Sequence, residues 1–388
     1  MKNMVDQHIA VFGESGSGKT VLLSSFYGPT QEKGFAERNR FNVVAESQTQ
    51  AVSLYQNYVG MRDSRILPEP TQFRSTAYSF LLKMAVRTPG AQKNKPSHDM
   101  MRVVWHDYPG EWFEKDVSGE EADRRVEGFR ELLGSDVAIL LVDAQRLIDN
   151  AGQEHAYLKS LFFNYRQGFE ALKDSILDDG SPLTRFPRIW MIALSKADLL
   201  PDLDVHALKD LVIGKAGADL ARLNETISSM VQAPDALSVG DDFLLLSSAK
   251  FTPEEIRLED RIGLDLILPI ASVLPYERHL RWVNAKQLPV EVGKRLLSSA
   301  DALAGVLGGV LGLLARRAPV RIRPVVGLVA GFLSKDKVEQ FVEMGRDRLE
   351  EVERTAVEKR EYLIATLAKF RIDLQAGEAD DVLLRSLR

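Results

Sequence analysis

The sequence predicts a doubly wound α/β domain over residues 1–262, followed by an all-helical region over residues 263–388. Short apolar runs alternate with helix-like segments through the first part, an order typical of a mostly parallel sheet with helices on both faces. The apolar runs are uninterrupted, as in strands that are buried on both faces. After about Leu264 no further strand-like run occurs, so the remainder is expected to be helical.

The composition is that of an ordinary folded protein, with 45% hydrophobic and 27% charged residues among 388. This length exceeds that of a usual single domain, which supports the division at residue 262. The net charge of −5 gives no electrostatic reason to expect nucleic acid as a partner. The absence of cysteine excludes disulfides and thiolate metal sites. The first residues lack the apolar core of a secretory signal, so a cytoplasmic location is expected.

The elements of the first domain can be placed in order. The predicted parallel strands are "HIAVFG", "MMRVVWHD", "VAILLVDA", "RIWMIALSK" and "FLLLSSA". The predicted helices between them are "EEADRRVEGFRELL", "HAYLKSLFFNYRQGFEALKDSIL" and "HALKDLVIGKAGADLARLNETISSMV". Residues 31–70, polar at first and then helical around "QTQAVSLYQNYVGM", are interpreted as an insertion. A second strand, "FRSTAYSFLLKMAV", follows it, and "RTPGAQKNKPSHD" is typical of an exposed hairpin tip.

The loop "GESGSGKT", residues 13–20, follows the first strand and fits the phosphate-binding pattern G-x-x-x-x-G-K-T completely. Its glycines let the backbone curl so that N–H groups point at an anion. Lys19 can reach the β- and γ-phosphates, the Thr20 hydroxyl can bind Mg²⁺, and the next helix directs its positive dipole end at the phosphates. The predicted nucleotide-binding residues here are Gly13, Glu14, Ser15, Gly16, Ser17, Gly18, Lys19, Thr20 and Val21.

The second element is "VVWHDYPGEWF", in which Asp107 ends a predicted buried strand and Gly110 follows three residues later. The Asp107 carboxylate can hold Mg²⁺ through water, and the Gly110 N–H can sense a γ-phosphate. Asp107 can also begin a tight Asp-Tyr-Pro-Gly turn, and the two interpretations are compatible.

Two further elements follow the last two predicted strands. In "MIALSKADLL", Lys196 is expected to lie along a base, and Asp198 to accept hydrogen bonds from N1–H and the 2-amino group of guanine. Adenine lacks this donor pair. A solvated charge pair at a helix start is the alternative. In "LLLSSAK", the Ala249 N–H is predicted to donate to guanine O6, flanked by Ser248 and Lys250.

The four elements, in this order and each at a strand end, resemble those of the Ras-like (TRAFAC) class of P-loop GTPases. The stretch "DYPGEW" looks like the YcjX-type GTPases and related large bacterial Ras-like proteins. The resemblance covers about residues 5–255. It implies a Ras-like fold, Mg²⁺-dependent binding and hydrolysis of GTP, and two loops that reorder when the γ-phosphate leaves.

Two positions depart from the family pattern. The base-reading motif usually begins with Asn, where this chain has Ser195, whose shorter side chain cannot make every amide contact. Where Ras-like enzymes often carry a water-orienting Gln, this chain has Glu111, which can polarise water but repels the γ-phosphate. Slow intrinsic hydrolysis, stimulated by a partner or by self-association, is therefore expected.

The resemblance also implies a threonine that closes over Mg²⁺ and the γ-phosphate. Thr71, just before the second predicted strand, is the first candidate, and Thr76 is the second. A Thr71 that only ends a proline-rich turn is the competing interpretation. Arg62, Arg65 and Arg74 lie nearby in the sequence and are expected at the surface, so no catalytic arginine is assigned.

The C-terminal region contains two glycine-rich apolar runs, "LAGVLGGVLGLLA" and "PVVGLVAGFL", separated by an arginine-rich link. Each run is too short to span a bilayer. Residues 301–333 are interpreted as a buried helical hairpin or as a hairpin that enters one membrane leaflet, with the buried form favoured. A long amphipathic helix over residues 336–374 is expected to pack on this region or to mediate self-association.

The function expected from these residues is that of a GTP-binding switch with Mg²⁺-dependent hydrolysis of GTP to GDP, whose output is the helical region. An effector protein or a second copy of the chain would bind through that region, and residues 301–333 would make any contact with the inner face of a membrane. Two alternatives remain open. One is a nucleotide-gated membrane-associating module with little hydrolysis, similar in layout to dynamin-like GTPases, or a partner-binding module of that kind. The other is an ATP-dependent P-loop enzyme.

Overall fold

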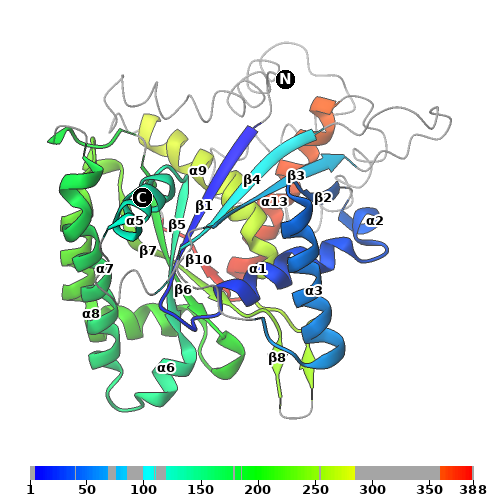
Figure 1. Ribbon diagram of the computed structural model, residues 1–388, viewed down its shortest axis with the longest axis horizontal. Coiled ribbons are helices and arrows are strands. Elements are labelled where there is room, and N and C mark those ends of the chain that lie inside the picture. Colours follow the sequence, from blue (N-terminus) through cyan, green and yellow to red (C-terminus); the bar gives the residue numbers. More distant parts are fainter. Residues whose placement is uncertain are drawn as a thin grey trace.

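The computed structural model describes residues 5–39, 41–68, 76–84, 99–108, 110, 119–177, 180–184, 186–252, 255–284 and 359–386. Its centre is an eight-stranded sheet with the strand order β10-β7-β6-β5-β1-β4-β3-β2 (Figure 1). The strands of the sheet are β1 (Val5–Phe12), β2 (Phe41–Ala45), β3 (Thr76–Met84), β4 (Asp99–Asp107), β5 (Val137–Asp143), β6 (Ile189–Ser195), β7 (Ser238–Leu246) and β10 (Leu383–Leu384). A separate hairpin consists of β8 (Lys250–Phe251) and β9 (Ile256–Arg257).

The five strands predicted as parallel are confirmed as β1, β4, β5, β6 and β7, which are neighbours in the sheet and all run in the same direction. The predicted second strand is confirmed as β3, which pairs antiparallel with β4. Every residue of β5 and β6 is buried, which explains their uninterrupted apolar sequences. Because the five strands are parallel, the loops that follow them meet at one edge of the sheet.

Helices cover both faces of the sheet, as predicted. The α-helices are α1 (Lys19–Tyr27), α2 (Phe35–Asn39), α3 (Gln48–Ser64), α5 (Glu120–Leu133), α6 (Ala144–Asp149), α7 (Glu154–Ile176), α8 (Val205–Ser228), α9 (Ile267–Asn284) and α13 (Lys359–Ala379). The short 3₁₀ turns are η1 (Gly28–Gln31), η3 (Ala197–Leu199), η4 (Pro234–Ala236) and η5 (Leu264–Leu266).

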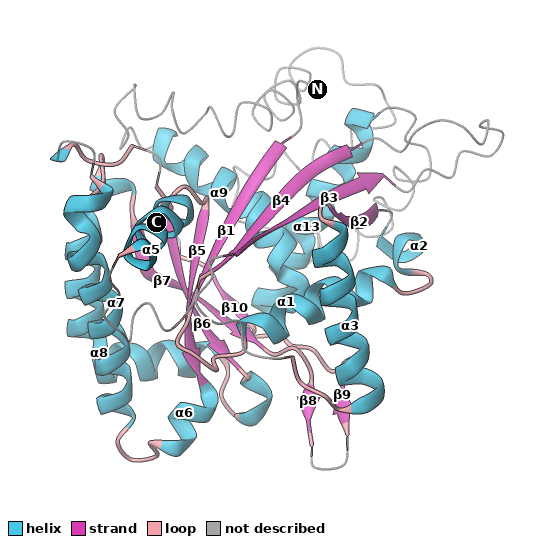
Figure 2. Ribbon diagram, viewed as in Figure 1, coloured by secondary structure: helices cyan, strands magenta, loops and turns pink. Residues whose placement is uncertain are grey.

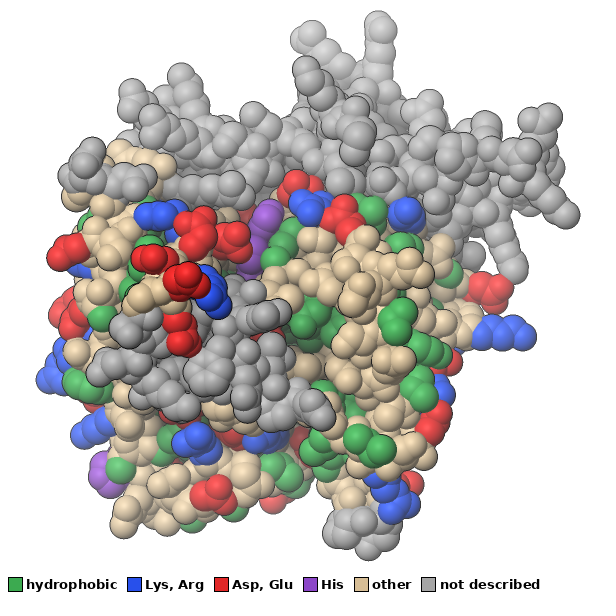
Figure 3. Space-filling view, in the orientation of Figure 1, with side chains coloured by type: hydrophobic (Ala, Val, Ile, Leu, Met, Phe, Trp, Pro, Cys, Tyr) green, Lys and Arg blue, Asp and Glu red, His purple; other side chains and the backbone are tan. Residues whose placement is uncertain are grey.

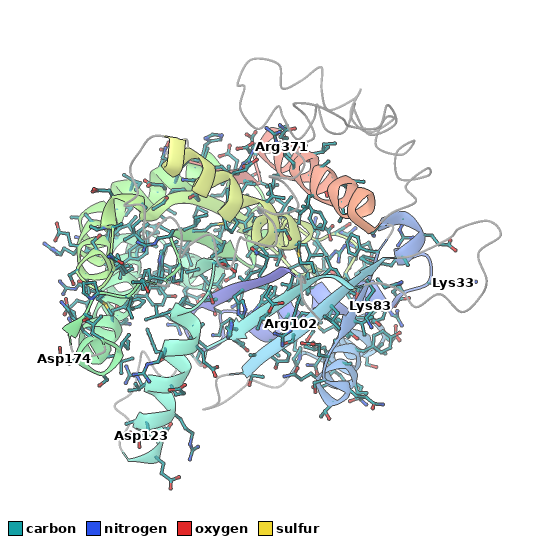
Figure 4. The ribbon with its side chains drawn as sticks, turned by 90° about the horizontal axis from the view of Figure 1, so that it is seen from above. Lys33, Lys83, Arg102, Asp123, Asp174 and Arg371 are labelled. Carbon is teal, nitrogen blue, oxygen red and sulfur yellow. The ribbon has the colours of Figure 1, made fainter. Side chains whose placement is uncertain are left out.

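The alternation of side chains along β1 shows how the two layers form. Ile9 and Val11 belong to the hydrophobic core that contains residues of α1, α9 and α13. Ala10 and Phe12 belong to the core on the opposite face, with residues of α5, α7 and α8. Seen from above, α9 and α13 lie on one side of the sheet and α5 on the other (Figure 4).

The predicted insertion, residues 31–70, contains the expected helix, which is α3. The Ser47 side chain accepts a hydrogen bond from the Gln50 N–H, at 3.4 Å, and so caps the start of α3. The insertion also contains β2, which is not predicted from the sequence. This strand has only five residues, and Phe41 and Val43 are buried while Val44 is exposed, the pattern of a short edge strand. The predicted hairpin tip at residues 87–99 lies almost entirely outside the described residues.

The described part of the C-terminal region packs on the sheet. Residues of α9 and α13 share one hydrophobic core with β1, and β10 adds an antiparallel strand beside β7. The sequence predicts only helices after Leu264, so β10 is a departure from that prediction. A strand of two residues that pairs with an existing sheet edge leaves no recognisable pattern in the sequence. The predicted hairpin, residues 301–333, and most of the predicted long helix lie outside the described residues. In the described ranges no helix is both long and apolar enough to cross a membrane.

Charged side chains fasten the C-terminal segments to the sheet. Asp242 of β7 and Arg278 of α9 form an ion pair in which both side chains are fully buried. Beside it, Glu277 of α9 pairs with Arg385 at 2.8 Å and with Arg371 of α13 at 3.5 Å. Arg371 is labelled in Figure 4. Removing one partner of a buried pair leaves an uncompensated charge, so this network favours the packing of α9, α13 and Arg385 beside β7.

Candidate nucleotide-binding site

The loop from Gly13 to Gly18 joins β1 to α1 at the edge where the parallel strands end (Figure 2). Gly16 and Gly18 have φ angles of 80° and 89°, a left-handed conformation that favours glycine. A Cβ atom on Gly13 would lie 2.4 Å from Ser17 Oγ, so the loop is also too tight for a larger residue there. The curled loop expected from the sequence is therefore the conformation that these glycines allow.

Lys19 and Thr20 begin helix α1. Lys19 Nζ donates hydrogen bonds to the carbonyl oxygens of Gly13 at 2.7 Å and Glu14 at 3.1 Å, so its ammonium group bends back over the loop. The main-chain N–H groups of the first turn of a helix have no partner within the helix, which makes this end attractive to anions. The loop, the ammonium group and the helix start thus surround one position suited to phosphate groups.

Gly110 lies directly against this loop. A Cβ atom on Gly110 would come within 2.2 Å of Ser15 N and 2.4 Å of the carbonyl carbon of Glu14, which leaves room for glycine alone. Two elements 90 or more residues apart in sequence therefore meet in backbone contact. Glu111 and the other residues up to 118 lie outside the described residues.

Asp107 ends β4 next to the end of β1, paired in register with Val11. Asp107 is only 4% exposed. Burial together with the negative charge of Asp107 raises the pKa of Tyr78, on the adjoining β3, to about 12. A buried carboxylate thus lies at the strand end where the sequence predicts a magnesium ligand.

Of the two threonines predicted to close over Mg²⁺ and the γ-phosphate, the structure describes one. Thr71 and Arg74 lie outside the described residues, whereas Thr76 begins β3 and is the register partner of Asp107. Thr76 therefore lies beside the predicted magnesium ligand. Arg62 pairs with Asp63 at 2.7 Å and also with Glu32, on a partly exposed surface, as expected for a residue outside the site.

Helix α5 begins at Glu120, near the start of the next described segment, and packs on the face of the sheet that contains Phe12. Its first turn carries Glu120, Glu121 and Asp123, which complement the positive end of the helix dipole. Acidic side chains gather over this helix on the surface in Figure 3, and Asp123 is labelled in Figure 4. The predicted helix "EEADRRVEGFRELL" is confirmed with the same bounds as α5.

The base-reading motif follows β6. Lys196 has a φ angle of 56°, so a non-glycine residue adopts a left-handed conformation at this corner. Its Nζ donates to Asp143 Oδ2 at 2.7 Å, and its Cε atom lies 4.0 Å from the position of a Cβ atom on Gly18. The Lys196 side chain therefore reaches from the base-reading motif to the phosphate-binding loop.

Asp198 is held by the loop that follows β7. Its Oδ1 accepts from Ser247 Oγ at 2.6 Å, and its Oδ2 accepts from the Phe251 N–H at 3.2 Å. An ionised carboxylate has about four acceptor positions, so these two bonds orient Asp198 and leave capacity for two more. Ser248 and Ala249 are buried beside it, while Lys250 is exposed. The two predicted base-site elements, which follow β6 and β7, are thus brought together.

Ser195 is 1% exposed, and its Oγ donates to the Val142 carbonyl oxygen at 3.3 Å. The hydroxyl is thus used between two strands of the sheet. Two charged residues near the site were not predicted from the sequence: Asp143, which holds Lys196, and Arg146, whose Nε lies 3.4 Å from Glu14 Oε2. The signal for Asp143 was a carboxylate directly after the buried run "VAILLV", at the same edge as Asp107 and Asp198.

The sequence profile of the Double-GTPase 2 family matches residues 7–242, which is more than half of the chain. The chain belongs to the Double-GTPase 2 family. Among curated proteins no sequence matches it. The family assignment confirms the GTPase part of the resemblance, and the mixed sheet is consistent with a P-loop GTPase. The finer likeness to YcjX-type GTPases stays a prediction.

Membership of the Double-GTPase 2 family implies guanine-nucleotide binding and GTPase activity. The matched residues include the phosphate-binding loop, Asp107, Gly110 and the base-reading motif. They end within β7, so the loop that holds Asp198 and all of α9 and α13 lie beyond the match.

Proposed function

We propose that this Double-GTPase 2 protein binds GTP and GDP at the carboxyl edge of the sheet and hydrolyses GTP as a nucleotide-controlled switch. The observation that supports this most is the meeting of three elements at one loop. Gly110 lies against the backbone of residues 13–15, and the Lys196 side chain reaches Gly18 in the same loop. The triphosphate and the base are opposite ends of one nucleotide, so the loops that bind them must lie close together.

The phosphate end fits the chemistry of a nucleoside triphosphate. The glycine conformations at positions 16 and 18 suit a loop that surrounds phosphate, and Lys19 supplies a positive charge over it. Mg²⁺, when bound, would neutralise charge on the β- and γ-phosphates, and oxygen atoms are the ligands it prefers. Thr20, Asp107 and either Thr71 or Thr76 are proposed to hold it, and the Gly110 N–H is proposed to sense the γ-phosphate.

The base end is proposed to select guanine through Asp198. Its two internal hydrogen bonds fix the carboxylate, so the remaining acceptor positions are oriented before a base arrives. Lys196 is proposed to lie along the base plane, and Ala249 N–H to donate to guanine O6. Adenine presents no pair of donors to such a carboxylate, which favours GTP over ATP as the nucleotide.

Hydrolysis is proposed to be slow without a partner, because Glu111 stands where Ras-like enzymes often carry Gln. The proposed output is the C-terminal region, through which an effector protein or a second copy of the chain would bind. Contact with a membrane surface through residues 301–333 is part of the same proposal. Binding to liposomes that depends on the nucleotide would support that contact, and equal absence of binding with GTP and GDP would refute it.

The decisive test exchanges the group that reads the base. Asp198→Asn replaces two acceptors by one donor and one acceptor, which no longer matches guanine but matches xanthine, whose C2 carries a carbonyl. We expect the variant to lose about 100-fold in GTP affinity and to bind xanthosine triphosphate instead. Asp202→Asn, an exposed residue in the following turn, is the matched control and should keep the wild-type preference. Equal binding of GTP and ATP by the wild-type chain would refute the proposal.

A further inference from the structure

The corner between β5 and α6, residues 143–146, contacts both nucleotide-binding loops. Asp143 ends β5, is 3% exposed, and is the register partner of Ser195 at the end of β6. Arg146 lies one helical turn further along the chain, with a side chain that is 43% exposed. Neither residue belongs to the motifs that the sequence brings to notice.

Asp143 makes three hydrogen bonds, two through its carboxylate and one through its main-chain N–H. Its Oδ2 accepts from Lys196 Nζ at 2.7 Å, and its Oδ1 accepts from the Gln145 N–H at 2.9 Å, which caps α6. Its own main-chain N–H donates to the Tyr157 hydroxyl at 3.0 Å. A carboxylate held this firmly defines where the Lys196 ammonium group lies, since charge-assisted hydrogen bonds are the stronger ones.

Lys196 needs such support. Its left-handed backbone conformation is unfavourable for a residue with a side chain and persists only where the surroundings stabilise it. The adjacent Ser195 hydroxyl bonds to Val142 within the sheet. The contact with Asp143 ties the Lys196 side chain to the neighbouring strand β5.

Arg146 makes a corresponding contact with the other loop. Its Nε lies 3.4 Å from Glu14 Oε2, and the Glu14 side chain is only 10% exposed. Two residues on one corner thus hold a side chain of the base-reading motif and a side chain of the phosphate-binding loop. The spacing between these two loops must match the length of one nucleotide.

We infer that Asp143 and Arg146 are positioning residues that set the spacing of the two loops, and that Asp143 thereby determines how strictly the base loop reads guanine. This inference rests on the proposed function. Loss of the Asp143 charge would let Lys196 and the adjoining turn move. Asp198 would then accept a weaker hydrogen bond from the 2-amino group of guanine. Loss of the Arg146 contact would loosen the phosphate-binding loop and leave the reading of the base intact.

The test compares dissociation of fluorescently labelled GDP and inosine diphosphate, which lacks the 2-amino group. Asp143→Asn keeps the shape and the cap on α6 but removes the charge that faces Lys196. We expect GDP to dissociate about 10- to 100-fold faster, with a smaller preference for GDP over inosine diphosphate. Arg146→Ala should speed dissociation of both nucleotides equally, by about 3- to 10-fold, and preserve the preference.

Asp149→Asn is the matched control, because Asp149 lies on the same helix and bonds only to the Gln145 side chain, at 2.8 Å, among the interactions described for it. It should release both nucleotides at the wild-type rate.

A purely structural role for Asp143 would lower the melting temperature without changing the preference between the two bases, and that result would overturn the inference. Should Asp143→Asn fail to fold, Arg146→Ala decides, since substitution of a side chain that is 43% exposed usually changes stability little. Unchanged dissociation would then overturn the inference. A wild-type chain that binds neither nucleotide would instead refute the proposed function.

Discussion

The two ends of the candidate site are built in different ways. The phosphate-binding loop, residues 13–20, is contiguous in sequence, and its shape depends on glycine backbone at positions 16 and 18. The base-reading motif, residues 195–198, depends on side chains far away in sequence. Asp143 and Lys196 are 53 positions apart, and Ser247 and Asp198 are 49 apart.

This difference predicts how each end responds to mutation. A loop that is shaped by its own backbone fails when a single residue within it, or a residue in backbone contact with it, is changed. A loop that is held by distant side chains loses affinity in smaller steps as each contact is removed, because each hydrogen bond contributes about 1 kcal/mol on average. The following predictions run from the largest expected effect to the smallest.

The largest effect is expected for Lys19→Ala, which removes the charge over the phosphate-binding loop. GTP hydrolysis should fall about 1,000-fold, since stabilisation of developing charge is commonly the largest contribution to catalysis. Phosphate release in the presence of Mg²⁺ measures it. Lys33→Ala, an exposed lysine labelled in Figure 4, is the control and should hydrolyse GTP at the wild-type rate. Equal hydrolysis rates for both variants would show that the phosphate-binding loop does not take part in GTP hydrolysis.

Gly110→Ala tests the backbone contact between the two halves of the phosphate end. The added methyl group would overlap Ser15 N at 2.2 Å, so either loop must shift. We expect hydrolysis to fall about 100-fold, because a displacement of about 1 Å in a catalytic group can cost this much. Gly214→Ala is the matched control, since nothing lies within 4 Å of its Cβ position. A fully active Gly110→Ala protein would show that the contact is not needed.

Ser247→Ala tests the distant support of the base end. It removes the contacts of Ser247 Oγ with Asp198 at 2.6 Å and with the Ala249 carbonyl oxygen at 2.7 Å, but leaves the bond from the Phe251 N–H to Asp198. GDP affinity should fall about 10-fold, the value of one hydrogen bond to a charged group. Ser195→Ala removes a neutral bond to Val142 and should change affinity by less than about 3-fold. Titration of a fluorescent nucleotide measures both, and the reverse order would contradict the assignment of roles.

The smallest effect concerns pH. The pKa of Tyr78 is raised from 10.0 to about 12 in the folded protein, so the folded state holds this proton more tightly than the unfolded state. The resulting stability is fully present below about pH 10 and is lost as the pH rises through about 12. Difference absorbance titration of wild type against Tyr78→Phe measures this pKa. Asp107→Asn should lower the pKa of Tyr78, because a nearby negative charge is removed. An unchanged pKa would show that the Asp107 charge does not act on Tyr78.

The sequence predicts most of the fold because the relevant signals are local. The runs that form β5 and β6 are apolar throughout, and α5 has both the acidic start and the amphipathic spacing of a helix. Among the elements that were not predicted, β2 and β10 are short strands at the two edges of the sheet. Their existence depends on pairing with β3 and β7, and a pairing partner cannot be recognised within five residues or two.

For the candidate site, the sequence by itself determined the conformation of the loop at residues 13–20, because glycine conformations and a helix start are encoded where they occur. It also indicated Asp107, Gly110 and Asp198 through their positions at strand ends. Only the tertiary structure decided that Gly110 rests on Ser15, that Asp143 holds Lys196, and that Arg146 reaches Glu14. These contacts join residues that are distant in the chain, and they arise only when parallel strands bring their ends to one edge of the sheet.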